Sequence, residues 1–285
     1  MSLVKVDDIL KDARKRKYGI PCFLGGNVEM ILGAIRAAED VNSPLILCFN
    51  EAITPDIPME LGMPLLVDAA KRSTAPVATI LDHGTKFDSC IKAIRYGSSS
   101  VMFDGSILPY EENLRMTQEL RQITFAADVA LEAELGSIGG SVLEYGESTG
   151  IESGYTDPER AVEFVARTNV DVLAISFGNV HGRYHGGGEL DLDLVRSIHS
   201  KIDIPLVMHG GSGLSGQTYI DIIDAGISKI NYYTAISRGA AYAVADVVKR
   251  DGDDIIYHTL ISKSIDYFYH ESKRVLQLFG CAGQA

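Results

Sequence analysis

The chain has 285 residues, of which 46% are hydrophobic and 22% are charged, values that are typical of a globular protein rather than a disordered one. Its net charge of −12 argues against a nucleic-acid partner, although backbone amides, lysines or a metal ion could still bind a phosphate group locally. Four scattered cysteines, a charged N-terminus and the lack of a long apolar run argue against a disulfide framework, a signal peptide and a membrane span, so we expect a cytoplasmic protein with no membrane partner.

Short apolar runs alternate with amphipathic segments along the chain. After a helix over residues 6–17, strands are expected at 19–24, 45–49, 77–81, 100–103, 129–135, 171–176, 204–208 and 228–230. Helices are expected at 28–40, 59–72, 87–96, 111–126, from 156 onward, at 190–201, 215–225 and 234–249, with one or two more over 255–279. Eight strand–helix units predict an α/β fold, a closed (β/α)8 TIM barrel with extra N-terminal and C-terminal helices, in a single domain over residues 1–285.

Two local expectations follow from the same patterns. Residues 136–155 are rich in glycine and show no helical period, and a long loop of this kind in a compact domain is typical of a functional lid. Within the helix at 111–126, Asn113 and Arg115 are expected to face outward.

Three of the seven histidines come directly after predicted strands. His83 follows the strand at 77–81, His181 the strand at 171–176 and His209 the strand at 204–208. The carboxyl ends of barrel strands form one rim, and three imidazoles with an open fourth position are the usual catalytic zinc arrangement. Any one of these histidines alone could be a hydrogen-bonded loop or core residue, but three on one rim favour a metal site.

Carboxylates lie on the same rim. We expect Asp82 to act as a general acid or base beside the metal, because neighbouring strand residues point to opposite faces and Asp82 would not share the metal with His83. Asp104 and Glu134 could hold a second cation or could orient the histidines, and a purely structural salt bridge also stays open. Glu132 lies on the same face of its strand as Glu134.

Glycine-rich turns supply a candidate anion site. His209-Gly210-Gly211-Ser212-Gly213 precedes a predicted helix, whose free amide groups and the serine hydroxyl could bind a phosphate. Asn231 and Thr234 follow the eighth strand, and the loops after strands seven and eight are a frequent phosphate site in barrels.

A metal, a phosphate site and an acid together suit retro-aldol cleavage of a phosphorylated ketose without a Schiff base. The metal would chelate the ketone and a neighbouring hydroxyl, while Asp82 exchanges a proton with the hydroxyl at the carbon where the bond breaks. Lys229 on the eighth strand could be proposed as a Schiff-base lysine, but that role would be redundant with a metal site, and an ion-pair role is the alternative.

These residues resemble the class II, metal-dependent fructose-bisphosphate aldolase family, particularly its shorter ketose- and tagatose-bisphosphate members. The resemblance covers nearly the whole chain and rests on Leu81-Asp82-His83-Gly84, Val101-Met102-Phe103-Asp104, Glu132-Ala133-Glu134-Leu135-Gly136, Gly178-Asn179-Val180-His181-Gly182, His209-Gly210-Gly211-Ser212-Gly213-Leu214 and Lys229-Ile230-Asn231.

The resemblance implies roles for individual residues. It implies that His83, His181 and His209 bind the catalytic Zn2+ and that Asp82 is the proton donor. It places Gly182, Gly210, Gly211, Ser212, Asn231 and Thr234 around dihydroxyacetone phosphate, and it matches Asp104 and Glu134 to a second, movable divalent cation. It further implies a loop acid, here Glu144 or Glu147, a Na+ or K+ ion near the phosphate, and a homodimer or homotetramer.

Three positions depart from the family pattern. Phe23-Leu24 stands where the first strand usually ends Phe-Asn, and Ser141-Val142-Leu143 follows Gly139-Gly140 where acids are usual. Tyr232 and Tyr233, which are candidate substrate-binding residues, precede Thr234 where many relatives have a small or acidic residue. The metal residues are unaffected, whereas Leu24 and Tyr233 could reshape the pocket for the aldehyde half of the substrate.

The expected function is therefore cleavage of fructose 1,6-bisphosphate or a related ketose bisphosphate to dihydroxyacetone phosphate and an aldehyde such as glyceraldehyde 3-phosphate. The alternatives are a tagatose-bisphosphate or other phosphoketose aldolase, and a phosphosugar-binding barrel without catalysis. A metal-dependent hydrolase is disfavoured, because the first strand, with Cys22-Phe23-Leu24, has no His-x-His.

Overall fold

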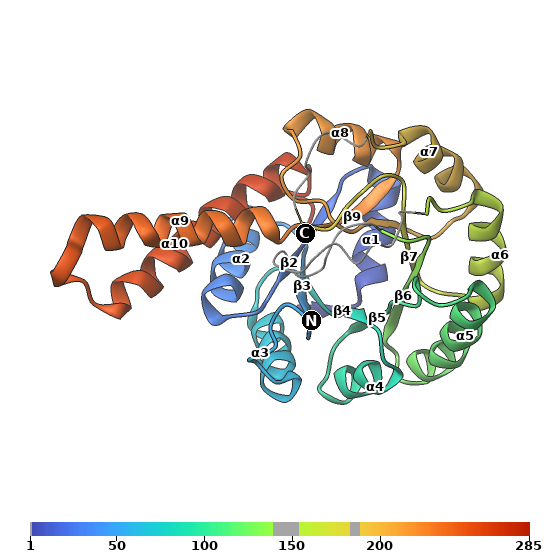
Figure 1. Ribbon diagram of the computed structural model, residues 1–285, viewed down its shortest axis with the longest axis horizontal. Coiled ribbons are helices and arrows are strands. Elements are labelled where there is room, and N and C mark those ends of the chain that lie inside the picture. Colours follow the sequence, from blue (N-terminus) through green and yellow to red (C-terminus); the bar gives the residue numbers. More distant parts are fainter. Residues whose placement is uncertain (1, 139–153, 183–188) are drawn as a thin grey trace.

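Buried, mostly aliphatic runs form one parallel sheet. The computed structural model describes residues 2–138, 154–182 and 189–285. Its strands are β1 (Leu3–Val4), β2 (Ile20–Leu24), β3 (Leu45–Phe49), β4 (Val77–Gly84), β5 (Ser100–Phe103), β6 (Ala130–Leu135), β7 (Val172–Ile175), β8 (Leu206–Met208) and β9 (Ile227–Asn231). Strands β2 to β9 pair in a ring that the β4–β5 pairing closes, so the chain forms the expected TIM barrel (Figure 1).

Strand β1 was not expected from the sequence. It pairs with β4 outside the ring, where Leu3 lies opposite Val77 and Val4 lies opposite Ala78. Two residues are too short to show a period of two, so the hydrophobic pattern could not predict this strand.

Helices alternate with the strands. They are α1 (Val6–Arg16), α2 (Val28–Asp40), α3 (Met59–Arg72), α4 (Phe87–Arg95), α5 (Tyr110–Ala126), α6 (Pro158–Thr168), α7 (Leu192–Lys201), α8 (Gly216–Ala225), α9 (Thr234–Asp251) and α10 (Tyr257–Leu278), with a 3-10 turn at Gly252–Asp254. Helices α2 to α8 surround the barrel in Figure 1, and α1 contacts β4 and β9 across one end of it. None of the helices in the described ranges combines the length and the apolar character that crossing a bilayer requires.

Polar residues in the connecting loops cap the first turns of several of these helices. The Asn27 side chain accepts a hydrogen bond from the Met30 amide at 2.8 Å, and Ser215 accepts one from Thr218 at 3.1 Å. These side chains satisfy amide groups that the first helical turn leaves unpaired. The connections after β2, β4 and β9 are short, since α2, α4 and α9 begin within four residues of the ends of these strands.

The last two helices form a hairpin. Helices α9 and α10 extend away from the barrel in Figure 1, and α10 packs along both α9 and α2. The α2–α10 approach depends on Gly33, where an added Cβ would lie 2.6 Å from Cβ of Phe268 and 2.8 Å from the backbone nitrogen of Tyr269. The segment over residues 255–279, for which one or two helices were expected, contains the single long helix α10.

One helix residue faces a different direction from our expectation. Asn113 on α5 is buried, and its side-chain amide donates a hydrogen bond to the Glu134 carbonyl at 3.0 Å. Arg115 faces outward as expected, since its side chain is 58% exposed. The expectation for Asn113 was wrong because it is a polar residue that secures the end of β6 from behind, a role that helical spacing does not reveal.

Candidate active site

The end of β4 directs two neighbouring side chains into one pocket. Asp82 and His83 both line it, although strand alternation predicted opposite faces. That part of the prediction was wrong because His83 has a left-handed backbone, with φ of +50°, and because the pairing of β4 with β5 shifts register between Leu81 and Gly84. Such an irregularity re-aims side chains locally. Asp82 therefore lies beside the imidazole rather than behind it.

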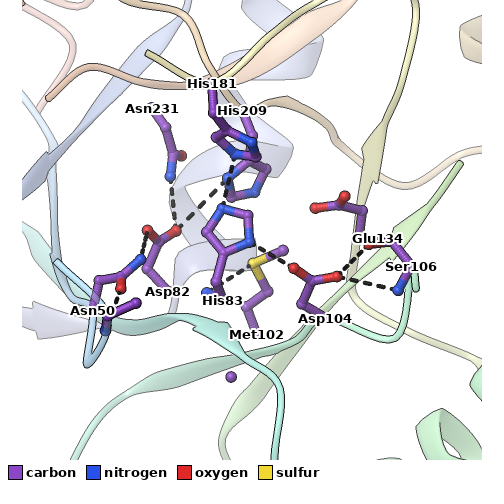
Figure 2. A network of polar contacts seen from close by, with 12 residues as sticks. Asn50, Asp82, His83, Met102, Asp104, Ser106, Glu134, His181, His209 and Asn231 are labelled. Atoms are coloured by element: carbon purple, nitrogen blue, oxygen red, sulfur yellow. Dashed lines mark hydrogen bonds and ion pairs between the residues drawn. The ribbon is translucent and has the colours of Figure 1, made fainter. Parts of the chain in front are cut away.

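Three imidazoles meet at this rim (Figure 2). His83 comes from β4, His181 from the loop after β7 and His209 from the residue after β8. Nε2 of His83 lies 3.1 Å from Nε2 of His181, and the ring centres of His83 and His209 are 4.5 Å apart. One nitrogen from each ring lies within 4.8 Å of the others, a spacing at which one ion could contact all three.

A buried ion pair orients His209 from below. Glu132 Oε1 lies 2.9 Å from Nε2 of His209, and both Glu132 oxygens accept from Nζ of Lys229, at 2.9 and 2.7 Å. A carboxylate only accepts hydrogen bonds, so Nε2 of His209 carries the proton and Nδ1 carries a lone pair. Nδ1 is buried and has no hydrogen-bond partner among the described residues. Lys229 is fully buried in this pair, which supports the ion-pair role and disfavours a Schiff-base role.

Two further acids lie on the other side of His83. Asp104 Oδ2 is 2.7 Å from Nδ1 of His83, and Oδ1 accepts from the amide and hydroxyl of Ser106 at 3.1 and 2.6 Å. Glu134 is buried nearby, and its Oε2 has no hydrogen-bond partner within the described ranges. His83, Asp104 and Glu134 could themselves hold an ion, since one atom from each lies within 4.8 Å of the others. The geometry thus accommodates both expected roles of the acids.

Two amide side chains hold the Asp82 carboxylate. Asn231 donates to Oδ1 at 2.8 Å, and Asn50 donates to Oδ2 at 3.1 Å (Figure 2). Asn231 was a predicted site residue, whereas Asn50 was not. Asn50 directly follows the buried strand β3, so the rule that singled out the histidines at strand ends would have found it.

The charges of this cluster compete with burial. Burial favours protonated Asp82, but His83, His209 and Lys229 lower the pKa of its carboxyl below the ordinary value, which leaves it able to accept a proton. Burial also opposes charge on His83, but Asp82 and Asp104 raise its pKa to about 10, so this position attracts positive charge. Burial and the neighbouring histidines lower the pKa of His181 to about 3.

For His209 and Glu134, burial prevails and the pKa shifts favour the neutral form of each side chain. Burial and the charges of His83 and Lys229 lower the pKa of His209, which keeps this imidazole neutral and able to bind a metal. Burial and the nearby Asp104 raise the pKa of Glu134, because two carboxylates this close cannot both ionise easily. A cation between Asp104 and Glu134 would relieve that repulsion.

Most of the predicted substrate residues line the pocket. Its lining includes Gly182, Gly210, Ser212, Asn231, Tyr233 and Thr234, together with Ile53 from the loop after β3.

Gly211 and Tyr232 are directed elsewhere. The Gly211 amide donates to the Asn231 carbonyl at 3.1 Å, and the Tyr232 hydroxyl donates to Glu271 of α10 at 2.9 Å. Leu24 is buried and is not one of the lining residues of this pocket, so Tyr233 is the unusual residue that reaches it. The predicted loop acids Glu144 and Glu147 lie outside the described residues.

Comparisons with known proteins agree with the barrel fold. The family described as "Fructose-bisphosphate aldolase class-II" matches residues 4–284. The chain is 34% identical over 293 residues to a fructose-bisphosphate aldolase of Geobacillus stearothermophilus, covering 100% of this chain and 99% of that one. It is 31% identical over 288 residues to a 6-phospho-5-dehydro-2-deoxy-D-gluconate aldolase of Halalkalibacterium halodurans, covering 100% and 99%. The crystal structure of the YdjI aldolase from Escherichia coli K12 superimposes with a TM-score of 0.87 at 32% identity, covering 99% of each chain.

Proposed function

The chain belongs to the class II fructose-bisphosphate aldolase family, and we propose that it is a zinc-dependent ketose-bisphosphate aldolase. The proposed reaction is the reversible cleavage of fructose 1,6-bisphosphate, or a related ketose, to dihydroxyacetone phosphate and an aldehyde such as glyceraldehyde 3-phosphate. The observation that carries the proposal is the convergence of His83, His181 and His209 beside the carboxylate of Asp82.

The three imidazoles fit a zinc ion by their chemistry. Nδ1 of His209 is a buried lone pair with no partner among the described residues, and leaving such an atom unpaired has a cost that a bound cation would remove. Neutral imidazole nitrogens are common zinc ligands, and three of them leave a position open for substrate. When bound, the ion would supply a Lewis acid that polarises the substrate ketone.

Asp82 would move the proton of the cleavage step. Its lowered pKa keeps the carboxyl ionised and so able to accept a proton, and we assign to it the proton of the hydroxyl oxygen on the carbon where the bond breaks. In the direction of condensation, the same carboxyl would return that proton to the new hydroxyl. The amides of Asn231 and Asn50 orient the carboxylate for this transfer.

The phosphate of the dihydroxyacetone half would bind at the loops after β8 and β9. Gly210, Ser212 and Thr234 line this part of the pocket, and Thr234 begins α9, where the positive end of a helix favours an anion. We propose that Gly211 supports this loop through its bond to the Asn231 carbonyl rather than by binding phosphate itself.

Ile53 and Tyr233 bring apolar surface to the pocket, and we propose that this surface selects the aldehyde half of the substrate. A tagatose bisphosphate or another phosphoketose is the alternative substrate. The test is release of dihydroxyacetone phosphate from a panel of ketose bisphosphates, measured with EDTA and with added zinc. Zinc-dependent release from one sugar is expected, and it would also identify the aldehyde.

Two outcomes would contradict the proposal. Full activity after chelation would remove the metal from the mechanism. If no sugar of the panel releases dihydroxyacetone phosphate although zinc is verified as bound, a phosphosugar-binding barrel would be favoured. That function predicts that phosphoketoses stabilise the folded protein without turnover.

A further inference from the structure

Asn50 is buried at the end of β3 and makes contacts in two directions. Its Oδ1 accepts hydrogen bonds from the amides of Ala52 and Ile53, at 2.9 and 3.2 Å. Its Nδ2 donates to Oδ2 of Asp82 at 3.1 Å. The side chain is 1% exposed, so water does not compete effectively for these bonds.

The two backbone amides fix which way the Asn50 side chain faces. An N–H group can be matched only by an acceptor, so the carbonyl oxygen of Asn50 must face Ala52 and Ile53. The NH2 group is then forced to face Asp82. Because Asp82 lies on the neighbouring strand β4, this contact holds the carboxylate oxygen that Asn231 does not bind.

Each Asp82 oxygen receives one amide hydrogen and keeps a further lone pair. Oδ1 accepts from Asn231 and lies 3.8 Å from Nδ1 of His209, while Oδ2 accepts from Asn50. The two contacts prevent rotation of the carboxylate plane. The same Asn50 side chain also fixes the position of Ile53, which lines the pocket.

We propose that Asn50 is a positioning residue for proton transfer by Asp82, a role that rests on the proposed aldolase function. Asn50 is not one of the lining residues of the pocket, so it acts through Asp82 and not on the substrate. The contact matters for the step in which Asp82 exchanges a proton with the substrate hydroxyl. It does not enter the removal of the carbon-bound hydrogen beside the carbonyl of dihydroxyacetone phosphate.

Replacing Asn50 by Asp separates its two contacts. In N50D, one oxygen still accepts from Ala52 and Ile53, but the amide donor facing Asp82 is replaced by an acidic oxygen, so the contact is lost and a second carboxyl group lies beside Asp82. Asn50→Ser removes the same donor without adding charge, so an effect shared by the two variants reports the lost contact. We expect kcat for ketose cleavage to fall about 10- to 100-fold, the usual effect of misplacing a reacting group or its supporting partner. Zinc content and the exchange of the carbon-bound hydrogen of dihydroxyacetone phosphate with deuterated solvent should stay unchanged.

Thr54→Ala is the matched control. The Thr54 hydroxyl donates a hydrogen bond to the backbone carbonyl of Asn50 at 2.8 Å, and Thr54 does not line the pocket. Its replacement therefore disturbs the same loop without freeing Asp82. Cleavage and exchange should both match the wild type. Asn50→Ser is the second variant if N50D folds poorly, because the serine hydroxyl can still accept from the loop amides but is too short to reach Asp82.

The outcomes are distinguishable. Unchanged cleavage in N50D and Asn50→Ser would overturn the inference, and so would equal losses of cleavage, exchange and zinc, which would mean that Asn50 merely supports the fold. A wild-type protein that binds zinc but neither exchanges the hydrogen nor cleaves any ketose would instead overturn the proposed function, and the role assigned to Asn50 with it.

Discussion

Glu132 and His209 are joined inside the barrel by a 2.9 Å contact between two fully buried side chains. The contact fixes the proton on Nε2 and leaves Nδ1 facing the site. Lys229 on β9 balances the charge of Glu132 on β6 through the barrel interior, so the orientation of a rim imidazole depends on a buried ion pair below it.

Glu132→Gln should weaken zinc binding. Glutamine keeps the shape but loses the charge that pairs with Lys229, and its amide can turn either end toward His209, so the tautomer is no longer fixed. We expect the zinc dissociation constant to rise about 10- to 100-fold, measured by competition with a chelator. Glu163→Gln, which removes an exposed ion pair with Arg167, is the control and should leave zinc affinity unchanged. Unaltered affinity in Glu132→Gln would show that His209 is oriented without this carboxylate.

Zinc removal should lower thermal stability as well as activity. A ligand that binds only the folded state stabilises it by about 2.7 kcal/mol at one hundred times its dissociation constant, so the zinc-loaded protein should melt at a higher temperature than the chelated one. His209→Ala should abolish most of this shift. His258→Ala, which changes an exposed residue at the start of α10, should retain it. A zinc-dependent shift that survives in His209→Ala would place the ion elsewhere.

Gly210→Ala should inactivate the protein by displacing the His181 loop. Gly210 has a φ of +69°, and an added Cβ would lie 2.0 Å from the carbonyl oxygen of Val180, directly before His181. Gly213→Ala is the matched control, because Gly213 has a φ of +83° but no atom within 4 Å of the added carbon. Both variants should lose about 1 kcal/mol or more of unfolding free energy through backbone strain. Only Gly210→Ala should also lose zinc affinity and cleavage; equal effects of the two changes would contradict this expectation.

Gly33→Ala should weaken the packing of α10 on α2. The added carbon would meet backbone atoms of Tyr269 and Ile265 at 2.8 and 3.0 Å, and these cannot turn aside as a flexible side chain can. We expect a loss of about 1–3 kcal/mol in the free energy of unfolding, measured with urea. Gly216→Ala, whose carbon would meet only a Leu278 methyl group at 3.5 Å, should be close to neutral. A neutral Gly33→Ala would mean that the two helices can separate at little cost.

The barrel could be predicted because each strand is a buried run followed by an amphipathic helix. Every expected barrel strand has a counterpart in β2 to β9, with ends shifted by few residues. The two-residue strand β1 and the inward direction of Asn113 could not be predicted, since each depends on a contact with a distant element rather than on a local period.

The site was predictable as a set of residues but not as a set of contacts. Histidines at three strand ends indicated one rim, yet the placement of Asp82 beside His83 depends on a left-handed residue that alternation cannot reveal. Tyr232 was expected to face the substrate, but its hydroxyl bonds to Glu271 because α10 returns along the barrel. Partners so far apart in sequence become neighbours only after folding.

The left-handed backbone at His83 has a consequence for how much chemistry a barrel can carry. A regular strand presents only alternate residues toward the barrel axis, which limits each strand end to a single inward group near the rim. At β4, one residue with positive φ doubles that number, at a conformational cost of about 1–3 kcal/mol. A barrel of fixed size can therefore increase the density of reactive groups at its mouth by local irregularity, without adding a strand or lengthening a loop.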